Sequence, residues 1–298
     1  MEVPMSTIGI IGAGVMGRAA AGKLIETGYS LIAFDTAVSA LEKIMVLGAE
    51  GASSPAEVAG RADIILMFLP GPTEVEACVA GPHGLLQAAR SGMVIVDMST
   101  VDPGITVRMS EAARSQGMGY LDAPVLGRPA SVGNWALPVG GSEEDLECVQ
   151  PVLQKLASKI FLIGPSGTGN KVKLLNQLMF GAINAMTAEM MAIASQMGIE
   201  PGLLYETISA SRAGTVSNLF LELGARIGED RYEDPTFTVD LLVKDVRLAA
   251  QMARDHGAPP LLARTVEFMN EMAQVQGFGT EDTAVMWKSV KKMWEQKG

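Results

Sequence analysis

The sequence has few of the residues that build metal sites, disulfide frameworks or nucleic-acid surfaces. It contains two cysteines and two histidines among 298 residues, and Cys78 and Cys148 have no metal-type neighbours. No metal site is therefore expected, and the low cysteine content fits a reducing, cytoplasmic compartment. Basic residues are also scarce: 23 Lys and Arg against 33 Asp and Glu give a formal net charge of -10. This charge repels phosphate backbones and anionic lipids, so no nucleic-acid or membrane partner is expected.

Uninterrupted apolar runs are also missing. Glycines break up the first apolar segment, residues 8–17, and no basic stretch precedes it, so a signal peptide is not predicted. The most apolar long stretch, residues 172–197, is interrupted by lysine, glutamate and amide side chains, which predicts a buried helix of a soluble protein. With 48% hydrophobic residues the chain can bury two moderate cores, and its length favours two domains.

Short β-type runs alternate with helical patterns in the first half of the chain. The predicted strands cover residues 7–11, 30–34, 63–69, 93–98, 119–123, 135–139 and 159–163. Ser54-Pro55 and Asp102-Pro103 place a capping side chain before a proline at the start of predicted helices, and another helix begins near Ser142. This alternation predicts parallel βαβ units in a doubly wound sheet.

Strand patterns end at the glycine-rich residues 164–169, and the remaining patterns are helical almost throughout. We therefore predict an α/β fold in which a Rossmann-type, NAD-binding domain over residues 1–165 precedes an all-α domain over residues 166–298. The second domain would begin with a long interdomain helix and serve substrate binding and oligomerisation.

The cofactor assignment comes from the turn after the first predicted strand. This turn has the strand-turn-helix setting of the dinucleotide-binding fingerprint and consists of Gly12, Ala13, Gly14, Val15, Met16 and Gly17. Gly12 permits the tight turn, Gly14 lets the backbone approach the pyrophosphate, and Gly17 lets the helix pack close to the strand. The helix N-terminus supplies amide donors and a positive dipole. The alternative interpretation is an ordinary tight turn.

Asp35 ends the second predicted strand, 18 residues after Gly17 (35 − 17). An acidic residue at about this distance accepts hydrogen bonds from the adenosine ribose hydroxyls. Residues 36–39 offer no cation to offset repulsion between this carboxylate and a 2′-phosphate. The sequence thus favours NAD over NADP, although Asp35 could instead cap a turn.

Helical geometry distinguishes two lysines after the glycine-rich segment. At about 100° per residue, Lys173 shares a face with three amide side chains, whereas Lys171 aligns with leucines. The amides belong to Asn176, Gln177 and Asn184. A lysine beside amides on an apolar helix can be desolvated and so deprotonated more easily, which suits a general acid and base. The alternative is a lysine at the helix rim, with the amides satisfied in the core.

Five motifs occur in the order seen in the β-hydroxyacid dehydrogenase family, the 3-hydroxyisobutyrate dehydrogenase group. They are the turn at residues 12–17, DMST at 97–100 with Pro103, DAPV at 122–125, GTG at 167–169 followed by KLLNQ at 173–177, and Phe237 with Lys244-Asp245. The resemblance covers nearly the whole chain. It implies a Rossmann domain joined by a long helix to an all-α domain, an active site between them, and oligomers built through the helical part.

The resemblance also implies roles for single residues. Lys173 resembles the family's catalytic lysine, and Asn176 or Gln177 resembles its substrate-orienting amide. Lys244 resembles a second lysine that closes over the cofactor; the alternative is a solvated helix lysine. Residues that resemble the family's contacts near the nicotinamide ribose are Leu69, Pro70, Ser99 and Thr100.

One segment departs from the family pattern. After DAPV the family usually continues Ser-Gly-Gly and holds the substrate carboxylate there, whereas this chain has Leu126-Gly127-Arg128-Pro129 and a loop two residues shorter. The residues predicted to hold the acid group are Val125, Leu126, Gly127 and Arg128. Arg128 could bind a carboxylate or sulfonate through a bidentate pair, or it could point outward and stabilise the loop.

These features together predict a cytoplasmic, NAD-dependent dehydrogenase that acts on a small hydroxy acid, or in reverse on a semialdehyde, as a homodimer or homotetramer. Two alternatives are an imine reductase-like enzyme of the same fold and a non-catalytic NAD-sensing or scaffold protein. Imine reductases commonly lack a lysine at this position, so Lys173 argues against the first. Lys173 with its amide face argues against the second.

Overall fold

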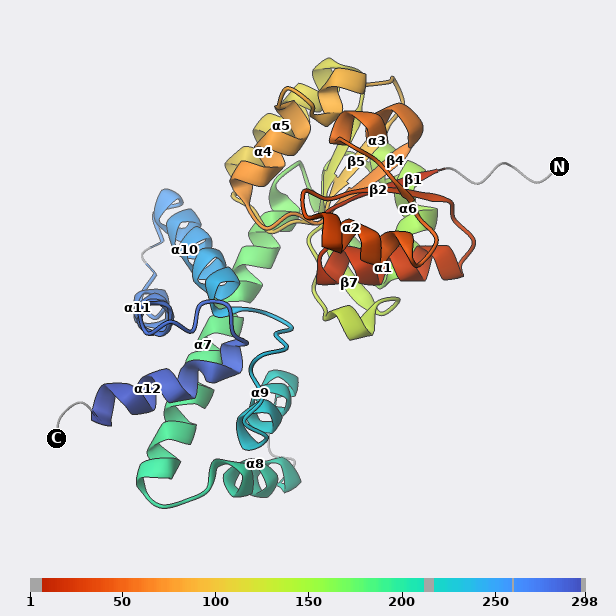
Figure 1. Ribbon diagram of the computed structural model, residues 1–298. Helices are drawn as coiled ribbons and strands as arrows, with labels where there is room; N and C mark the ends of the chain where they lie inside the picture. Colours follow the sequence, from red (N-terminus) through yellow and green to blue (C-terminus); the bar gives the residue numbers. More distant parts are fainter. Residues whose placement is uncertain (1–6, 212–216, 259, 296–298) are drawn as a thin grey trace. The chain divides into compact units, whose positions relative to one another are not determined.

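The computed structural model describes residues 7–211, 217–258 and 260–295 (Figure 1). The chain divides into two compact units, Met1–Lys173 and Leu174–Gly298. The boundary predicted after residue 165 lies in the loop before helix α7 (Thr168–Gln196), whereas the compact units divide within the first two turns of that helix.

Unit 1 contains an eight-stranded sheet in the order β3-β2-β1-β4-β5-β6-β7-β8. The strands are β1 (Ile8–Ile11), β2 (Leu31–Phe34), β3 (Glu50–Gly51), β4 (Ile64–Met67), β5 (Val94–Asp97), β6 (Gly119–Asp122), β7 (Trp135–Gly140) and β8 (Ala157–Gly164). All neighbours pair in parallel except β6 and β7, which meet at one antiparallel pair. All seven predicted strands are present, and the two-residue strand β3 is too short to show an alternating pattern.

Helices cover both faces of this sheet (Figure 1). They are α1 (Val15–Glu26), α2 (Val38–Met45), α3 (Pro55–Arg61), α4 (Pro72–Ala80), α5 (Pro103–Ser115) and α6 (Glu143–Leu156), with short 3₁₀ turns η1 (Leu85–Ala88) and η2 (Pro129–Ser131). Ile8 and Ile10 of β1 pack in the core cluster with α1 and α6, while Ile11 packs in the one with α3, α4 and α5. Successive strand side chains point to opposite faces, so the buried strands feed two apolar layers. The doubly wound prediction is confirmed.

Side-chain caps confirm the predicted helix starts. Ser54 Oγ accepts a hydrogen bond from the Glu57 amide at 3.1 Å, and Asp102 Oδ1 accepts one from the Gly104 amide at 2.8 Å. In each case a proline occupies the first helical position, where no backbone donor is needed. Caps of this kind typically contribute about 1 kcal/mol to stability.

Unit 2 is helical, as predicted. Besides the larger part of α7 it contains α8 (Pro201–Ala210), α9 (Asn218–Gly228), α10 (Val239–Asp255), α11 (Ala263–Val275), η3 (Thr283–Val285) and α12 (Met286–Glu295). Its described residues include one isolated bridge, between Thr238 and Asp282, and no strand. One apolar cluster joins α7, α9, α10, α11 and α12, and Phe180 of α7 packs edge-on against Phe237 with ring centroids 5.3 Å apart.

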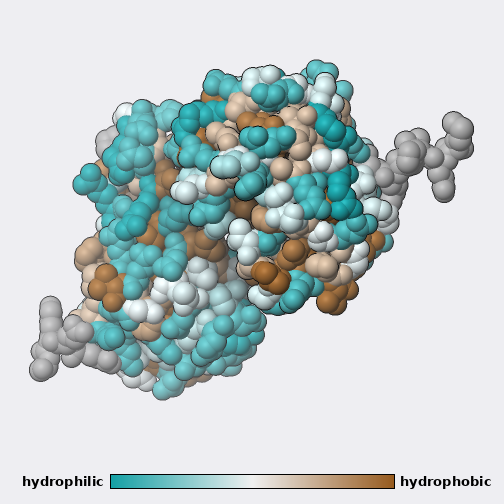
Figure 2. Space-filling view, turned by 45° about the horizontal axis from the view of Figure 1, so that its top comes forward, coloured by the Kyte–Doolittle hydropathy of each residue, from teal (hydrophilic) through white to brown (hydrophobic). Residues whose placement is uncertain are grey.

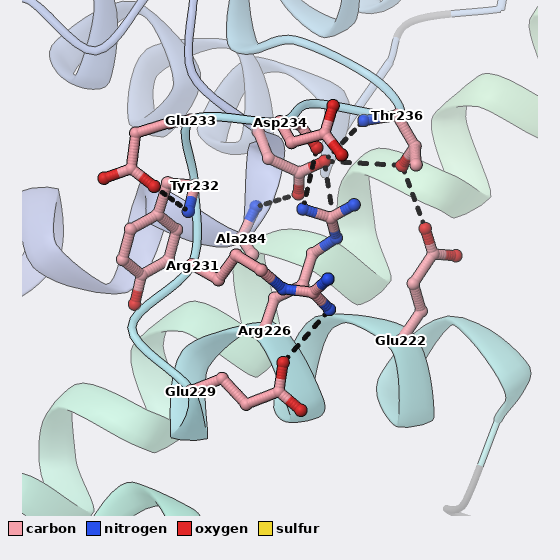
Figure 3. Close-up of polar contacts among 10 residues, drawn as sticks. Glu222, Arg226, Glu229, Arg231, Tyr232, Glu233, Asp234, Thr236 and Ala284 are labelled. Atoms are coloured by element: carbon pink, nitrogen blue, oxygen red, sulfur yellow. Dashed lines mark hydrogen bonds and ion pairs between the residues drawn. The ribbon is translucent and has the colours of Figure 1, made fainter.

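A buried polar cluster fixes the loop between α9 and α10 (Figure 3). Arg226 donates to the Asp234 carbonyl at 3.0 Å, and its Nε lies 3.7 Å from Asp282 Oδ2. The same carboxylate oxygen accepts the Thr236 amide at 3.0 Å. Removing one partner of a buried pair such as Arg226 and Asp282 is strongly destabilising. The cluster therefore fixes the start of the helix that carries Lys244.

The visible surface is largely hydrophilic, with apolar side chains in small groups among polar ones (Figure 2). Helix α7 differs, because apolar side chains spaced four or seven residues apart are exposed on one side of it. This apolar α7 stripe consists of Leu175, Met179, Met186, Ile193 and, just beyond the helix, Met197. The described residues of the chain leave these side chains exposed.

Among the described residues, α7 is the one helix long and apolar enough to cross a membrane by length and composition. Core helices share these properties, and 44% of its most apolar window is buried within the protein. Leu174, Gln177 and Ala188 are among its buried side chains. This burial supports the prediction that α7 is a core helix.

Candidate active site

The glycine turn between β1 and α1 has a different constraint at each glycine. Gly12 has a φ of +93°, and a Cβ there would collide with the Phe68 carbonyl; a Cβ at Gly17 would collide with the Gly12 carbonyl. At Gly14 the backbone conformation suits any residue, and no atom lies within 4 Å of an added Cβ. The fold therefore needs Gly12 and Gly17, while Gly14 leaves open space beside the N-terminus of α1. A pyrophosphate fits this arrangement of open backbone and helix dipole.

Asp35 connects this turn to the next helix. Its Oδ2 accepts the Ala13 amide at 2.6 Å, and its Oδ1 accepts the Ala37 amide at 2.7 Å, directly before α2. The carboxylate thus caps a turn, as the alternative interpretation expects, and it also lies against the dinucleotide turn. A carboxylate has about four acceptor sites, which leaves capacity for ribose hydroxyls.

The loops after β4 and β5 are joined by a buried network. The Leu69 amide donates to Ser99 Oγ at 2.9 Å, and the Ser99 amide donates to Asp97 Oδ1 at 2.9 Å. Asp97 is fully buried and also accepts the Tyr120 hydroxyl at 3.0 Å. Burial and the neighbouring Asp97 raise the pKa of Tyr120, so its hydroxyl stays protonated as a donor. The two joined loops carry the four contacts predicted near the nicotinamide ribose, Leu69, Pro70, Ser99 and Thr100.

The predicted substrate loop after β6 has a fixed backbone. Leu126 exchanges two backbone hydrogen bonds with Ala136 of β7, at 3.0 and 3.1 Å. The Arg128 carbonyl accepts the indole N–H of Trp135 at 2.8 Å. A Cβ at Gly127 would lie 2.5 Å from the ring of the buried Trp135, so the indole requires glycine there. The half-buried Arg128 side chain starts from this fixed backbone.

Lys173 reaches this loop from α7. Its Nζ donates to the Val125 carbonyl at 2.8 Å. The described residues give Lys171 no comparable hydrogen bond, in keeping with its different helical face. The structure thus brings together the predicted catalytic lysine and the start of the predicted substrate loop. An ammonium group has three donors, so the Val125 contact is compatible with a bond to a substrate hydroxyl.

The start of α7 is held by a buried carboxylate remote in sequence. Asp122, at the end of β6, is fully buried; its Oδ1 accepts the Gly167 amide at 2.7 Å and its Oδ2 accepts the Asn170 amide at 2.8 Å. Burial is the main cause that raises the pKa of Asp122 to about 7; nearby Asp97 acts in the same direction, and the two amide hydrogen bonds act against it. The carboxylate occupies the position where a helix N-terminus needs acceptors.

In unit 2, Asp245 links the predicted site residues Gln177 and Lys244, and Asn176 contacts Gln177. Gln177 Nε2 donates to Asp245 Oδ2 at 2.5 Å, and Gln177 Oε1 accepts a hydrogen bond from the side-chain Nδ2 of Asn176 at 3.2 Å. Lys244 Nζ lies 2.8 Å from Asp245 Oδ1, as an ion pair and not as a hydrogen bond of good geometry. Gln177 and Asp245 are buried, whereas Asn176 is exposed. Asn184, on the same predicted face, is a buried core amide.

The residues that hold these groups in place had no predicted role. They are Asp97, Asp122, Asn170 and Asp245. Each is polar at a position that its surroundings mark as buried, such as the last residue of VIVD at 94–97. Because buried polar groups are hydrogen-bonded, a carboxylate or amide at such a position is a usable signal in the sequence.

Comparison with known proteins agrees with this geometry. Residues 7–164 match the family described as the NAD binding domain of 6-phosphogluconate dehydrogenase. Residues 167–290 match the family described as NAD-binding of NADP-dependent 3-hydroxyisobutyrate dehydrogenase. The chain is 33% identical to 2-(hydroxymethyl)glutarate dehydrogenase of Eubacterium barkeri over 97% of its own length and 95% of the relative.

Solved structures show the same two-part fold. The 3-hydroxyisobutyrate dehydrogenase of Salmonella typhimurium superposes with a TM-score of 0.88 at 28% identity, covering 95% of this chain and 99% of that one. An imine reductase from Pseudomonas sp. superposes with a TM-score of 0.63 at 20% identity, covering 96% and 99%, which shows a likeness of fold alone. The dinucleotide turn, the motifs in register along both units and these matches place the chain in the β-hydroxyacid dehydrogenase family of nicotinamide-dependent oxidoreductases, to which it belongs.

Proposed function

We propose that this protein is an NAD-dependent dehydrogenase of a small β-hydroxy acid, with Lys173 as the general acid and base. The observation that supports this proposal most directly is the 2.8 Å hydrogen bond from Lys173 Nζ to the Val125 carbonyl, at the loop assigned to the substrate's acid group. Lys173 would take the proton of the substrate hydroxyl during oxidation and return it during reduction of the semialdehyde. When bound, NAD supplies the hydride acceptor for this reaction.

The chain offers a matching set of residues for NAD. The amides of the 12–17 turn would hold the pyrophosphate, and Asp35 would accept the adenosine ribose hydroxyls. The loops joined by Leu69 and Ser99 would face the nicotinamide end, and Lys244, fixed by Asp245, would add a cation. Asn176 is exposed and tied to the fixed amide of Gln177, which fits a substrate-orienting role for this pair.

The lysine assignment is tested by replacing each of two lysines in the same helix. Lys173→Ala should lower kcat about 10²- to 10⁴-fold, the usual range for a general acid or base, with little change in NAD affinity by fluorescence titration. Lys171→Ala is the matched control and should keep near-normal turnover. Circular dichroism shows whether each variant is folded. A folded Lys173→Ala variant with near-normal turnover would mean that another group moves the proton.

We further propose that the substrate carries a second acidic group, which Arg128 binds. The relative from Eubacterium barkeri is named for 2-(hydroxymethyl)glutarate, a dicarboxylic acid. Arg128 supplies a guanidinium in the loop where the family's usual motif has no cation, and a guanidinium can bind a carboxylate through two parallel hydrogen bonds.

A panel of monocarboxylic, dicarboxylic and sulfonated hydroxy acids, followed by NADH absorbance, tests this substrate class. The wild type should prefer acids with a second anionic group by about tenfold or more in kcat/KM, because a buried charge-assisted bond contributes about 1.5–3 kcal/mol. Arg128→Met should remove most of that preference and leave turnover of monocarboxylic acids within about threefold. Equal use of both classes by the wild type would contradict the assignment of Arg128.

The alternative functions have less support. The likeness to imine reductases is one of fold, and Lys173 bound to the substrate loop is the feature that this alternative does not explain. A non-catalytic sensor would not need a lysine held at this loop. The cytoplasmic location and the homo-oligomeric state also remain predictions.

A further inference from the structure

Asn170, in the first turn of α7, is fully buried, and its backbone N–H and both side-chain polar atoms have partners in unit 1. Its backbone N–H donates to Asp122 Oδ2 at 2.8 Å. Its side-chain Oδ1 accepts the Val101 amide at 3.1 Å, and its Nδ2 donates to Thr106 Oγ1 at 3.2 Å. One residue thus ties the start of α7 to β6 and to the loop after β5.

These bonds connect three parts of the proposed site. Val101 directly follows Thr100 in the loop assigned to the nicotinamide end, and Asp122 lies three residues before Val125. Lys173 lies one helical turn after Asn170 and donates to the Val125 carbonyl. The position of Lys173 relative to the cofactor loop and the substrate loop therefore depends on Asn170 and Asp122.

We propose that Asn170 and Asp122 are positioning residues that hold Lys173 in register with the Ser99–Thr100 loop. This inference rests on the proposed role of Lys173. The start of a helix can be capped by a nearby side chain, which would leave the helix able to shift relative to the sheet. Here the caps come from a carboxylate 45 and 48 residues away, so the helix start is fixed to the end of β6. A displacement of about 1 Å in a catalytic group can cost about 10²-fold in rate.

The test compares Asn170→Ala with a matched loss of a buried hydrogen bond. Ser110 Oγ lies 2.9 Å from Ser166 Oγ and joins α5 to the same segment before α7 without touching the Ser99–Thr100 loop. Asn170→Ala should lower kcat about 10- to 100-fold, with NAD affinity within about fivefold of the wild type. Ser110→Ala should keep kcat within about threefold.

An isotope effect separates positioning from simple loss of folded protein. With a substrate deuterated at the hydroxyl-bearing carbon, Asn170→Ala should show a larger primary isotope effect on kcat, because poor alignment makes the chemical step slower than product release. A merely structural role lowers the active fraction and leaves the isotope effect unchanged. An unchanged isotope effect, or an equal loss of kcat in Ser110→Ala, would overturn the proposal.

Asn170→Asp provides a second variant if the alanine variant does not fold. A protonated carboxyl has the same shape and the same donor and acceptor as the amide, whereas a carboxylate cannot donate to Thr106. The described contacts place Asp122 against the backbone N–H of this position, and the full burial of residue 170 favours the protonated, neutral form of the new carboxyl. Relative to the wild type at the same pH, kcat should be nearly normal near pH 6 and fall as the carboxyl ionises; a constant ratio would overturn the proposal.

The Lys173→Ala variant keeps the two hypotheses distinguishable. If Lys173→Ala retains turnover, the proposed function fails whatever Asn170 does. If Lys173→Ala loses turnover while folded Asn170→Ala keeps it, only the positioning proposal fails.

Discussion

Asp35 has a structural role, and we propose that the same carboxylate selects the cofactor. Its two oxygens accept the Ala13 and Ala37 amides, which fixes the carboxylate beside the dinucleotide turn. A ribose hydroxyl can donate to such a group, whereas a 2′-phosphate meets a negative charge that cannot rotate away. In this proposal the side chain acts on cofactor choice because the two backbone amides hold it in place.

We expect kcat/KM with NAD to exceed that with NADP by at least about tenfold, equivalent to about 1.4 kcal/mol. Asp35→Ser should reduce this ratio toward unity, since it removes the charge and keeps a hydroxyl for capping. Asp63→Ser, an exposed site at the start of β4, is the control and should leave the ratio unchanged. Equal kcat/KM values with NAD and NADP in the wild type would contradict the assignment of Asp35.

Single residues differ in how far the sequence predicts them. Gly17 follows from local geometry, because a side chain there would collide with the Gly12 carbonyl in the same turn. Gly12 follows from the tight turn, whose φ of +93° favours glycine, although the carbonyl that a side chain would meet belongs to Phe68. Lys173 follows from helical periodicity, although its partner Val125 lies 48 residues away. The apolar surroundings of Asp122 and Asp245 indicate buried, hydrogen-bonded carboxyls, but partners such as Gly167 and Gln177 come from other elements, so only the folded chain reveals them.

At the scale of elements, the start of α7 links stability to pH. The pKa of Asp122 is raised by burial to about 7, above the value of 3.8 that the carboxyl has in an unfolded chain. Between these values the folded protein keeps a proton that the unfolded chain releases. The contribution of this group to stability is therefore fully present below about pH 4 and is lost as the pH rises through about 7.

Urea unfolding at pH 5 and pH 7.5 measures this effect against Asp122→Asn, which cannot ionise. The free energy of unfolding of the wild type, relative to the variant, should fall by about 2 kcal/mol between the two pH values. Asp102→Asn, a half-exposed cap on α5, serves as the comparison and should show a much smaller change. A flat difference for Asp122→Asn would show that the carboxyl is ionised throughout this range.

The helices and strands were largely predictable from the periodicity of apolar residues and from capping, glycine and proline residues at their ends. Strands such as VIVD and helix starts such as Ser54-Pro55 carry local signals that the tertiary fold does not override. The antiparallel contact of β6 with β7 was not predictable, because it depends on how the loop at residues 125–132 reverses the chain. Strand β8 has eight residues where five were predicted, because its pairing with β7 continues beyond the apolar run on which the prediction was based.

At the scale of the whole molecule, the apolar α7 stripe leaves large side chains facing water. Met179 and Met186 are each 63% exposed, and Leu175 is 58% exposed. Contiguous exposed apolar surface of this kind usually marks an interaction site. The stripe supports the prediction that copies of this chain associate as a dimer or tetramer.

Light scattering at micromolar concentration should find a dimer or tetramer. Met186→Lys should shift the population toward monomer, because a desolvated ammonium at the contact is costly. Val46→Lys, at an 86% exposed position in unit 1, should leave the mass unchanged. A monomeric wild type would contradict the prediction.

The turn at residues 12–17 also separates what the fold needs from what a ligand needs. A side chain at Gly12 would collide with the Phe68 carbonyl, and one at Gly17 would collide with the Gly12 carbonyl. A descendant protein must therefore keep both glycines in order to fold. Gly14 has ordinary backbone angles and empty space above it, so folding places no demand on it. A lineage that stopped binding a dinucleotide would be free to lose this glycine first. The glycine at position 14 is therefore explained by the approach of a ligand and not by a demand of the fold.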